Sequence, residues 1–179
     1  MFSKIQMIGL RAAAVALACA TLAACAPELN WREVHGNDAH YTVLLPSKPA
    51  THARKVDLGG LKVEMSMTGA AVDELSFVVA SARIADPAQR AASLGAMQQA
   101  MLHNIRATRH TEKPVMLKGG VAATEIVADG QAGREGRPLV MYARFAARDD
   151  RVFQAVALGP RDKLSAEAAD TFLGSLLLQ

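Results

Sequence analysis

Cys25 is the residue of this sequence whose neighbours most clearly indicate a chemical reaction. It ends the tetrapeptide Leu22-Ala23-Ala24-Cys25, which closes an apolar run that begins at Ala12. The only other cysteine, Cys19, lies within that run, so a chain cut beside Cys25 keeps a single thiol and cannot form an internal disulfide. Cleavage of the chain at this junction is therefore the first chemistry to consider.

Residues 1–24 have the pattern of a secretory signal. Lys4 and Arg11 precede the apolar run, and no acidic residue occurs before Cys25. A membrane-spanning helix needs about 20 apolar residues, and the run after Arg11 has only about half that length, which favours cleavage over permanent insertion. An ordinary signal peptidase prefers small residues before the cut, so the bulky Leu22 suits that enzyme poorly.

The tetrapeptide resembles the lipobox of bacterial lipoproteins at all four positions. This resemblance implies that the thiol of Cys25 receives a diacylglyceryl group, that Cys25 becomes the first mature residue, and that a lipid anchor holds the protein on a membrane. The alternative is an ordinary secreted protein cut after Ala20 or Ala26. A cut after Ala26 would place Pro27 in the scissile bond.

The resemblance also predicts a location in the cell envelope. By likeness to lipoprotein sorting in envelopes with two membranes, the uncharged Ala26 favours the outer membrane, with the protein facing the periplasm. Residues 25–30 form a short tether of roughly 20 Å. The remaining residues, 31–179, should therefore lie close to the bilayer.

Composition predicts one globular domain over residues 31–179. Removal of 24 residues from 179 leaves 155, enough for one hydrophobic core. Lys4 and Arg11 are two of the 20 basic residues, so the mature chain has 18 of them against 17 acidic ones. Nucleic-acid binding needs a basic surplus on one face, and we expect no nucleic-acid partner.

The other candidates for chemistry are weaker. Arg134 and Arg137 lie among Gly130, Gly133 and Gly136, and this segment could bind an anion through backbone N–H groups or form a mobile hairpin loop. No Walker loop, G-x-S-x-G elbow or H-E-x-x-H helix occurs. We therefore predict no catalytic residue, no metal site and no cofactor. The histidines, none at a metal-binding spacing, are His35, His40, His52, His103 and His110.

Strands with tight turns dominate the first half of the domain. Gly59-Gly60 suits a two-residue hairpin turn between strands at 54–58 and 61–69, with Leu58 opposite Leu61. Apolar and polar residues alternate along 61–68, which predicts one buried and one solvated face. Residues 41–45 predict a strand, and 31–34 a short strand or entry segment, with Trp31 partly buried or among lipid headgroups.

Two helices interrupt the remaining strands. The apolar run 75–84 predicts a central strand covered on both faces, after which Asp86 caps a helix from Pro87 to about residue 107 or 108. Strands are expected at 115–117, 121–128, 139–147 and 152–158, with either Asp149-Asp150 or residues 148–151 as the last turn. Ser165 caps a short helix that stops at Gly174, before a strand or tail at 175–178.

This order predicts an α+β fold, in which one long helix (87–107) and a short C-terminal helix pack on a mostly antiparallel sheet of six to eight strands. Three segments resemble the PsbP-like α/β/α sandwich, a fold that includes bacterial lipoproteins and whose members mostly bind or support larger assemblies. They are Tyr41-Thr-Val-Leu-Leu-Pro46, Arg151-Val-Phe-Gln-Ala-Val156 and Phe172-Leu-Gly-Ser-Leu-Leu-Leu178.

We predict a non-catalytic binding or assembly-support module near the membrane, with an envelope protein as partner. The prediction rests on the expected lipid anchor, the near-neutral charge of the mature chain and the absence of a catalytic motif in the sequence. One alternative is a carrier of a small apolar ligand, which requires a cavity of roughly several hundred Å³ between sheet and helix. A less favoured alternative is an enzyme, which requires polar groups that converge in a cleft.

Overall fold

The computed structural model describes residues 29–179, and within them the fold is α+β, as predicted. The elements are β1 (Arg32–His35), β2 (Tyr41–Leu45), β3 (Ala50–Leu58), β4 (Leu61–Val72), β5 (Leu75–Arg83), α2 (Pro87–Asn104), β6 (Arg109–Met116), β7 (Ala122–Ala132), β8 (Arg137–Arg148), β9 (Arg151–Pro160), α3 (Ala166–Ser175) and β10 (Leu177–Leu178). Neither of these two helices is long and apolar enough to span a bilayer.

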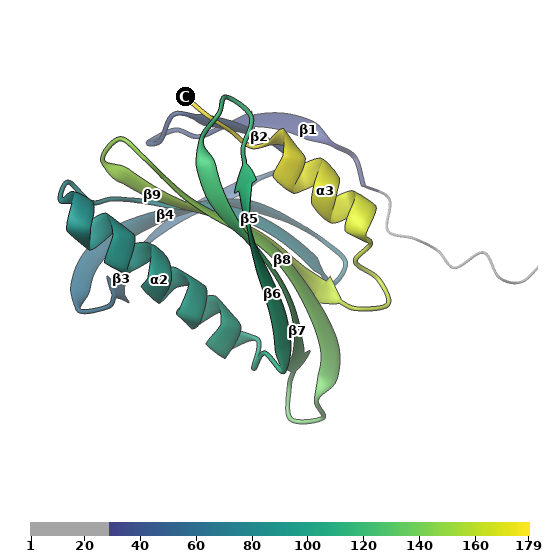
Figure 1. The fold of residues 1–179 in the computed structure, drawn as a ribbon. Coiled ribbons are helices and arrows are strands. Elements are labelled where there is room, and N and C mark those ends of the chain that lie inside the picture. The colour runs from purple at the N-terminus through teal and green to yellow at the C-terminus, as the bar shows by residue number, and fades with distance from the viewer. Residues whose placement is uncertain (1–28) are drawn as a thin grey trace, which may run out of the picture.

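Seven strands form one antiparallel sheet in the order β3-β4-β5-β9-β8-β7-β6, and three form a small sheet in the order β1-β2-β10. Figure 1 shows α2 across one face of the large sheet, whereas α3 and the small sheet cover the other face. The central strand expected at 75–84 is β5, which lies between β4 and β9.

The first predicted hairpin is confirmed. Gly59 and Gly60 have φ values of 71° and 92°, and Leu58 pairs with Leu61. The predicted alternation of more buried apolar and exposed polar residues along β4 holds in the first half of the strand only. Thr68, expected on the solvated face, is buried because the small sheet covers that end of the strand.

The turn between β8 and β9 has two residues rather than four. Arg148 pairs with Arg151, so Asp149-Asp150 is the turn. Asp149 has φ 51°, a conformation that aspartate tolerates because its side chain can hydrogen-bond to nearby backbone groups.

Helix α2 is capped as predicted but ends earlier. Asp86 accepts hydrogen bonds from two backbone N–H groups of the first turn. The last helical residue is Asn104, about three residues before the predicted end. Arg106 has left-handed backbone (φ 48°), and the next N–H, that of Ala107, donates to the Leu102 carbonyl at 2.9 Å. These bonds close the helix as a Schellman motif does.

Helix α3 begins as predicted, because the Ser165 hydroxyl accepts from the Ala168 N–H at 3.1 Å. It ends at Ser175, one residue beyond the predicted stop. The segment behind it is a strand, β10, in which Leu177 pairs with Thr42 of β2.

The two edge strands of the large sheet are longer than predicted. β3 begins at Ala50 rather than 54, and β6 begins at Arg109 rather than 115. Most of their residues are exposed on both faces, so the sequence shows no alternation there. Pro114 also argues against a strand, but an edge strand tolerates proline.

Two hydrophobic cores lie on opposite faces of the large sheet. The α2-side core contains Met97, Leu102 and Ile105 of the helix region with residues such as Met141 and Phe145 of the sheet. In the α3-side core, Phe77 makes edge-to-face contacts with Trp31 and Phe172, with ring centroids 5.7 and 5.5 Å apart.

Candidate functional site

Cys25, the predicted lipidation site, lies outside the described residues. The residues just behind it are already part of the body. Leu29 and Trp31 pack against the α3-side core, and the Asn30 N–H donates to the Pro46 carbonyl at 2.9 Å. The described part of the chain therefore begins against the α3-side core, beside the start of β1.

The two arginines proposed to bind an anion have different surroundings in the structure. Arg134 is exposed in the tip between β7 and β8, which spans residues 133–136. Arg137 begins β8 and forms an ion pair with Glu74, with Nη2 3.0 Å from Oε2. Gly130, expected in the tip, is buried in β7. A joint role of Arg134 and Arg137 in anion binding remains a prediction.

Glu74 connects three loops at this end of the sheet. It lies in the turn between β4 and β5 and also pairs with Lys163, in the loop after β9. Hydrogen bonds from Arg137 and then from Lys163 lower the pKa of its carboxyl from 4.5 to about 2. The carboxylate therefore stays ionised across the physiological range and serves as a cross-link between loops.

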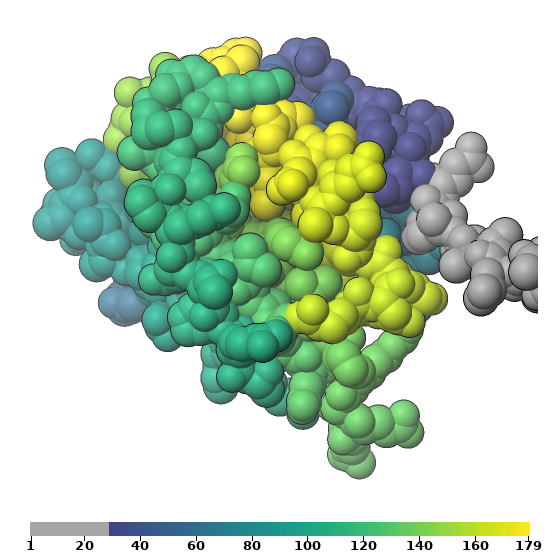
Figure 2. All heavy atoms as spheres, turned by 45° about the vertical axis from the view of Figure 1, so that its right-hand side comes forward, coloured from purple at the N-terminus to yellow at the C-terminus, as the bar shows by residue number. Residues whose placement is uncertain are grey.

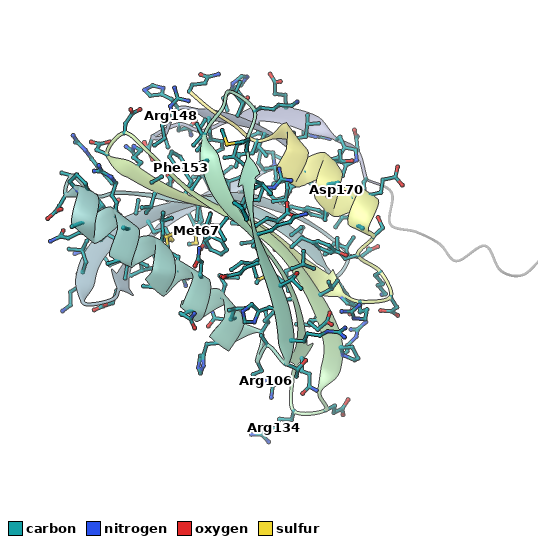
Figure 3. The ribbon with its side chains drawn as sticks, viewed as in Figure 1. Met67, Arg106, Arg134, Arg148, Phe153 and Asp170 are labelled. Carbon is teal, nitrogen blue, oxygen red and sulfur yellow. The ribbon has the colours of Figure 1, made fainter. Side chains whose placement is uncertain are left out.

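Two of the five histidines line the same surface hollow. His103 in the last turn of α2 and His110 in β6 line it together with Arg106, and its volume is about 460 Å³. The other lining residues are Gln99, Leu102 and Ala107. Figure 3 shows Arg106 at the end of α2, near the tip that carries Arg134. We call this feature the α2–β6 hollow.

A second hollow of about 380 Å³ lies on the other side of His110. It is lined by Arg109, His110, Thr111, Val127, Asp129 and Arg161. Asp129 pairs with both Arg109 and Arg161, and its carboxylate lies 2.9 Å from Arg109 Nε. Figure 2 shows the neighbouring α3 side, with α3 in yellow and β6 in blue-green on either side of atoms in lighter green.

Backbone geometry places the end of α2 against β7. A side chain at Gly130 would collide with the carbonyl and side chain of Ile105, so glycine is needed for this close approach. The Gln131 N–H donates to the Ile105 carbonyl at 2.7 Å. Arg106 then turns the chain toward β6 in a conformation that costs a residue other than glycine about 1 kcal/mol.

The two hollows offer cationic and hydrogen-bonding groups. In the part of the chain that the structure describes, no group of three or more His, Cys, Asp or Glu side chains could hold a metal ion. Neither hollow is an enclosed apolar cavity between sheet and helix, which the carrier alternative would require. Recognition of a polar, negatively charged group is the chemistry that these side chains suit.

A buried ionic network was not foreseen from the sequence. Glu125 in β7 is only 8% exposed, and its carboxylate lies 2.8 Å from Arg144 Nε and 2.9 Å from Lys113 Nζ. Burial raises the pKa of Glu125, but the hydrogen bonds from Lys113 and Arg144 outweigh it, so the pKa is lowered. Arg144 also donates to the Leu173 carbonyl of α3 at 2.9 Å. The network therefore fixes α3 to the sheet.

Comparison with known proteins adds little to this geometry. No family model matches the sequence, and no curated protein matches it. A solved structure of a Pseudomonas aeruginosa protein of unknown function shares 17% identity over 75% of this chain and 85% of that chain, with a TM-score of 0.37. A Bacteroides thetaiotaomicron structure shares 11% identity over 78% of this chain and 45% of that chain, with a TM-score of 0.42. Neither likeness indicates what this chain binds.

Two signals in the sequence could have revealed these features. Glu125 and Arg144 both interrupt the apolar face of their strands, and charges on facing apolar strands indicate a buried pair. Arg106 occupies the position where a helix most often ends in glycine. The predicted helix end at 107 or 108 concealed that position.

Proposed function

We propose that this chain is a bacterial envelope lipoprotein, anchored through Cys25, whose domain is a non-catalytic binding or assembly-support module close to the membrane. The observation that carries the proposal is the complete lipobox match at residues 22–25, directly behind a positively charged and apolar leader. Ala26 supports the outer membrane as its location, with the domain facing the periplasm.

The start of the described chain supports close attachment. Leu29 already packs against the body, so only residues 26–28 lie between it and Cys25. A fully extended chain from Cys25 to Leu29 spans roughly 14 Å. Two or more acyl chains hold a protein stably, because each buried methylene contributes about 0.8 kcal/mol. The side where β1 begins would therefore lie nearest the bilayer.

The finer fold assignment that we propose is the PsbP-like sandwich. The large antiparallel sheet supports it, with α2 on one face and α3 and the small sheet on the other. Because members of that fold mostly serve larger assemblies, we propose an envelope protein as the partner.

The anchor is tested by a pair of cysteine substitutions. Cys25→Ser should abolish acylation and cleavage before residue 25, whereas Cys19→Ser, which changes the leader only, should leave both unchanged. Mass spectrometry of the mature N-terminus should find acylated Cys25 in the parent protein. Normal processing and membrane pelleting of Cys25→Ser would contradict the proposal.

The binding role is tested by crosslinking in intact cells. The parent protein should yield a discrete crosslinked envelope protein on pull-down, and Cys19→Ser, which keeps the anchor, should yield the same product. Recovery of lipids alone would argue against an assembly partner.

A further inference from the structure

We propose that the α2–β6 hollow binds a phosphate monoester, held by Arg106, His103 and His110. This inference goes beyond the proposed function, because it requires neither the lipid anchor nor an envelope partner. The three side chains come from the last turn of α2, the connection behind it and the second residue of β6.

The charge of the hollow favours a dianion. Among the described residues no acidic side chain lines it, and Arg106 is a permanent cation. The two imidazoles add N–H donors. Arg109 and Arg161 on the other side of β6 share one carboxylate, that of Asp129, and so leave a net positive charge beside the hollow.

Arg106 occupies a position that glycine would fill with less strain, since its φ is 48°. Its guanidinium donates to the carbonyl of Gly133 in the β7–β8 tip. That bond uses one of the five N–H donors of a guanidinium and fixes the orientation of the planar group. The remaining donors suit two oxygens of one phosphate.

The negative end of the α2 dipole lies near the hollow and would oppose an anion. Several carbonyls at the helix end are, however, already hydrogen-bonded. Leu102 accepts from the Ala107 N–H, His103 accepts from the Arg106 N–H, and Ile105, just behind the helix, accepts from the Gln131 N–H. These bonds reduce the partial charge that the helix end presents.

The size of the hollow limits the ligand. A volume of about 460 Å³ exceeds that of a phosphate ion and admits a small organic group attached to it. The same chemistry could come from a soluble phosphate monoester or from the headgroup of phosphatidic acid, so the experiment includes both sources.

The full-length protein in detergent should be titrated with glycerol 3-phosphate while amide NMR signals are followed. We expect saturable shifts that centre on His103, Arg106 and His110. In parallel, vesicles of phosphatidylcholine with and without phosphatidic acid test the lipid source. Greater binding to the vesicles that contain phosphatidic acid, lost in the variant below, would assign the site to a headgroup; binding of the soluble ester alone would assign it to a free metabolite.

The deciding variant is Arg106→Gly, which removes the guanidinium and also the backbone strain. It should weaken glycerol 3-phosphate binding by at least about tenfold while the melting temperature stays the same or rises. His110→Gln should weaken binding without altering the helix end. Arg54→Ala, which removes an exposed arginine on β3 at the opposite edge of the sheet, should leave binding unchanged.

Three results would overturn the proposal: no saturable binding of the soluble ester or of phosphatidic acid, equal weakening by Arg54→Ala, or wild-type affinity in Arg106→Gly. Loss of binding in Arg134→Ala with wild-type affinity in His110→Gln would place the anion at the β7–β8 tip instead.

Discussion

The two faces of the large sheet are closed in different ways. On the α3 side, a helix and a second sheet cover the core, aromatic rings stack edge to face, and Arg144 connects a buried carboxylate to the last turn of the helix. On the α2 side, one helix covers a core of aliphatic, methionine and alanine residues with Phe145, and its end opens into a hollow lined by arginine and histidine. The α3 side is therefore held by a helix, a second sheet and an ionic network, whereas on the α2 side a single helix ends at the α2–β6 hollow.

The largest expected effect comes from the α3-side core. Phe172→Ala should destabilise the fold by about 3–5 kcal/mol, and Met97→Ala, at an equally buried place under α2, by about 2–4 kcal/mol. The difference arises because Phe172 also loses its edge-to-face contact with Phe77. Urea unfolding of both variants measures the difference between their losses in free energy of unfolding. A larger loss of stability in Met97→Ala than in Phe172→Ala would reverse the comparison.

A second test concerns the ionic network, which only the α3 side possesses. Arg144→Met should cost about 2–3 kcal/mol, because it leaves the buried Glu125 with a single, mostly exposed partner, Lys113. The double variant Glu125→Leu with Arg144→Met should recover most of this loss, since no buried charge remains unpaired. If the double variant is less stable than Arg144→Met in urea unfolding, the network is a net stabilising element and our account of it is wrong.

The smallest effect concerns a loop cross-link that belongs to neither core. The folded state lowers the pKa of Glu74 from 4.5 to about 2. Ionised Glu74 therefore stabilises the fold above pH 4.5, and this contribution disappears as the pH falls through 2. Glu74→Gln should lower the melting temperature slightly at pH 7 and match the parent below about pH 2.

Asp73→Asn provides the control for that experiment. It changes the adjacent acid of the same turn, and asparagine tolerates the φ of 51° found there. Its melting temperature should follow that of the parent throughout. A pH dependence equal to that of Glu74→Gln would show that general charge, rather than the pairs with Arg137 and Lys163, sets the acid stability.

Much of the fold could be predicted because local chemistry and tertiary structure agree. Gly59-Gly60, Asp86 and Ser165 each determine a turn or a cap within a few residues, and the structure places all three as expected. The starts of β3 and β6 could not be predicted, since edge strands exposed on both faces lack a buried side that would make the pattern alternate.

The candidate site was not predicted from the sequence, for a different reason. His103, Arg106 and His110 are each ordinary surface residues on their own, and only the early end of α2 and the early start of β6 bring them together. Both of those boundaries were misplaced in the prediction. The roles predicted for Cys25, Arg134 and Arg137 remain predictions.

The pairing of β10 with β2 has a consequence for the order of folding. Thr42 meets Leu177, and the N–H of Gln179 donates to the His40 carbonyl at 2.8 Å. As the chain emerges from its N-terminus, β2 can pair with β1 at once but must wait for its second partner, β10, until synthesis is complete. The hairpins from β3 to β9 involve residues closer in sequence and can form earlier. The small sheet is therefore the last layer of the fold to be completed.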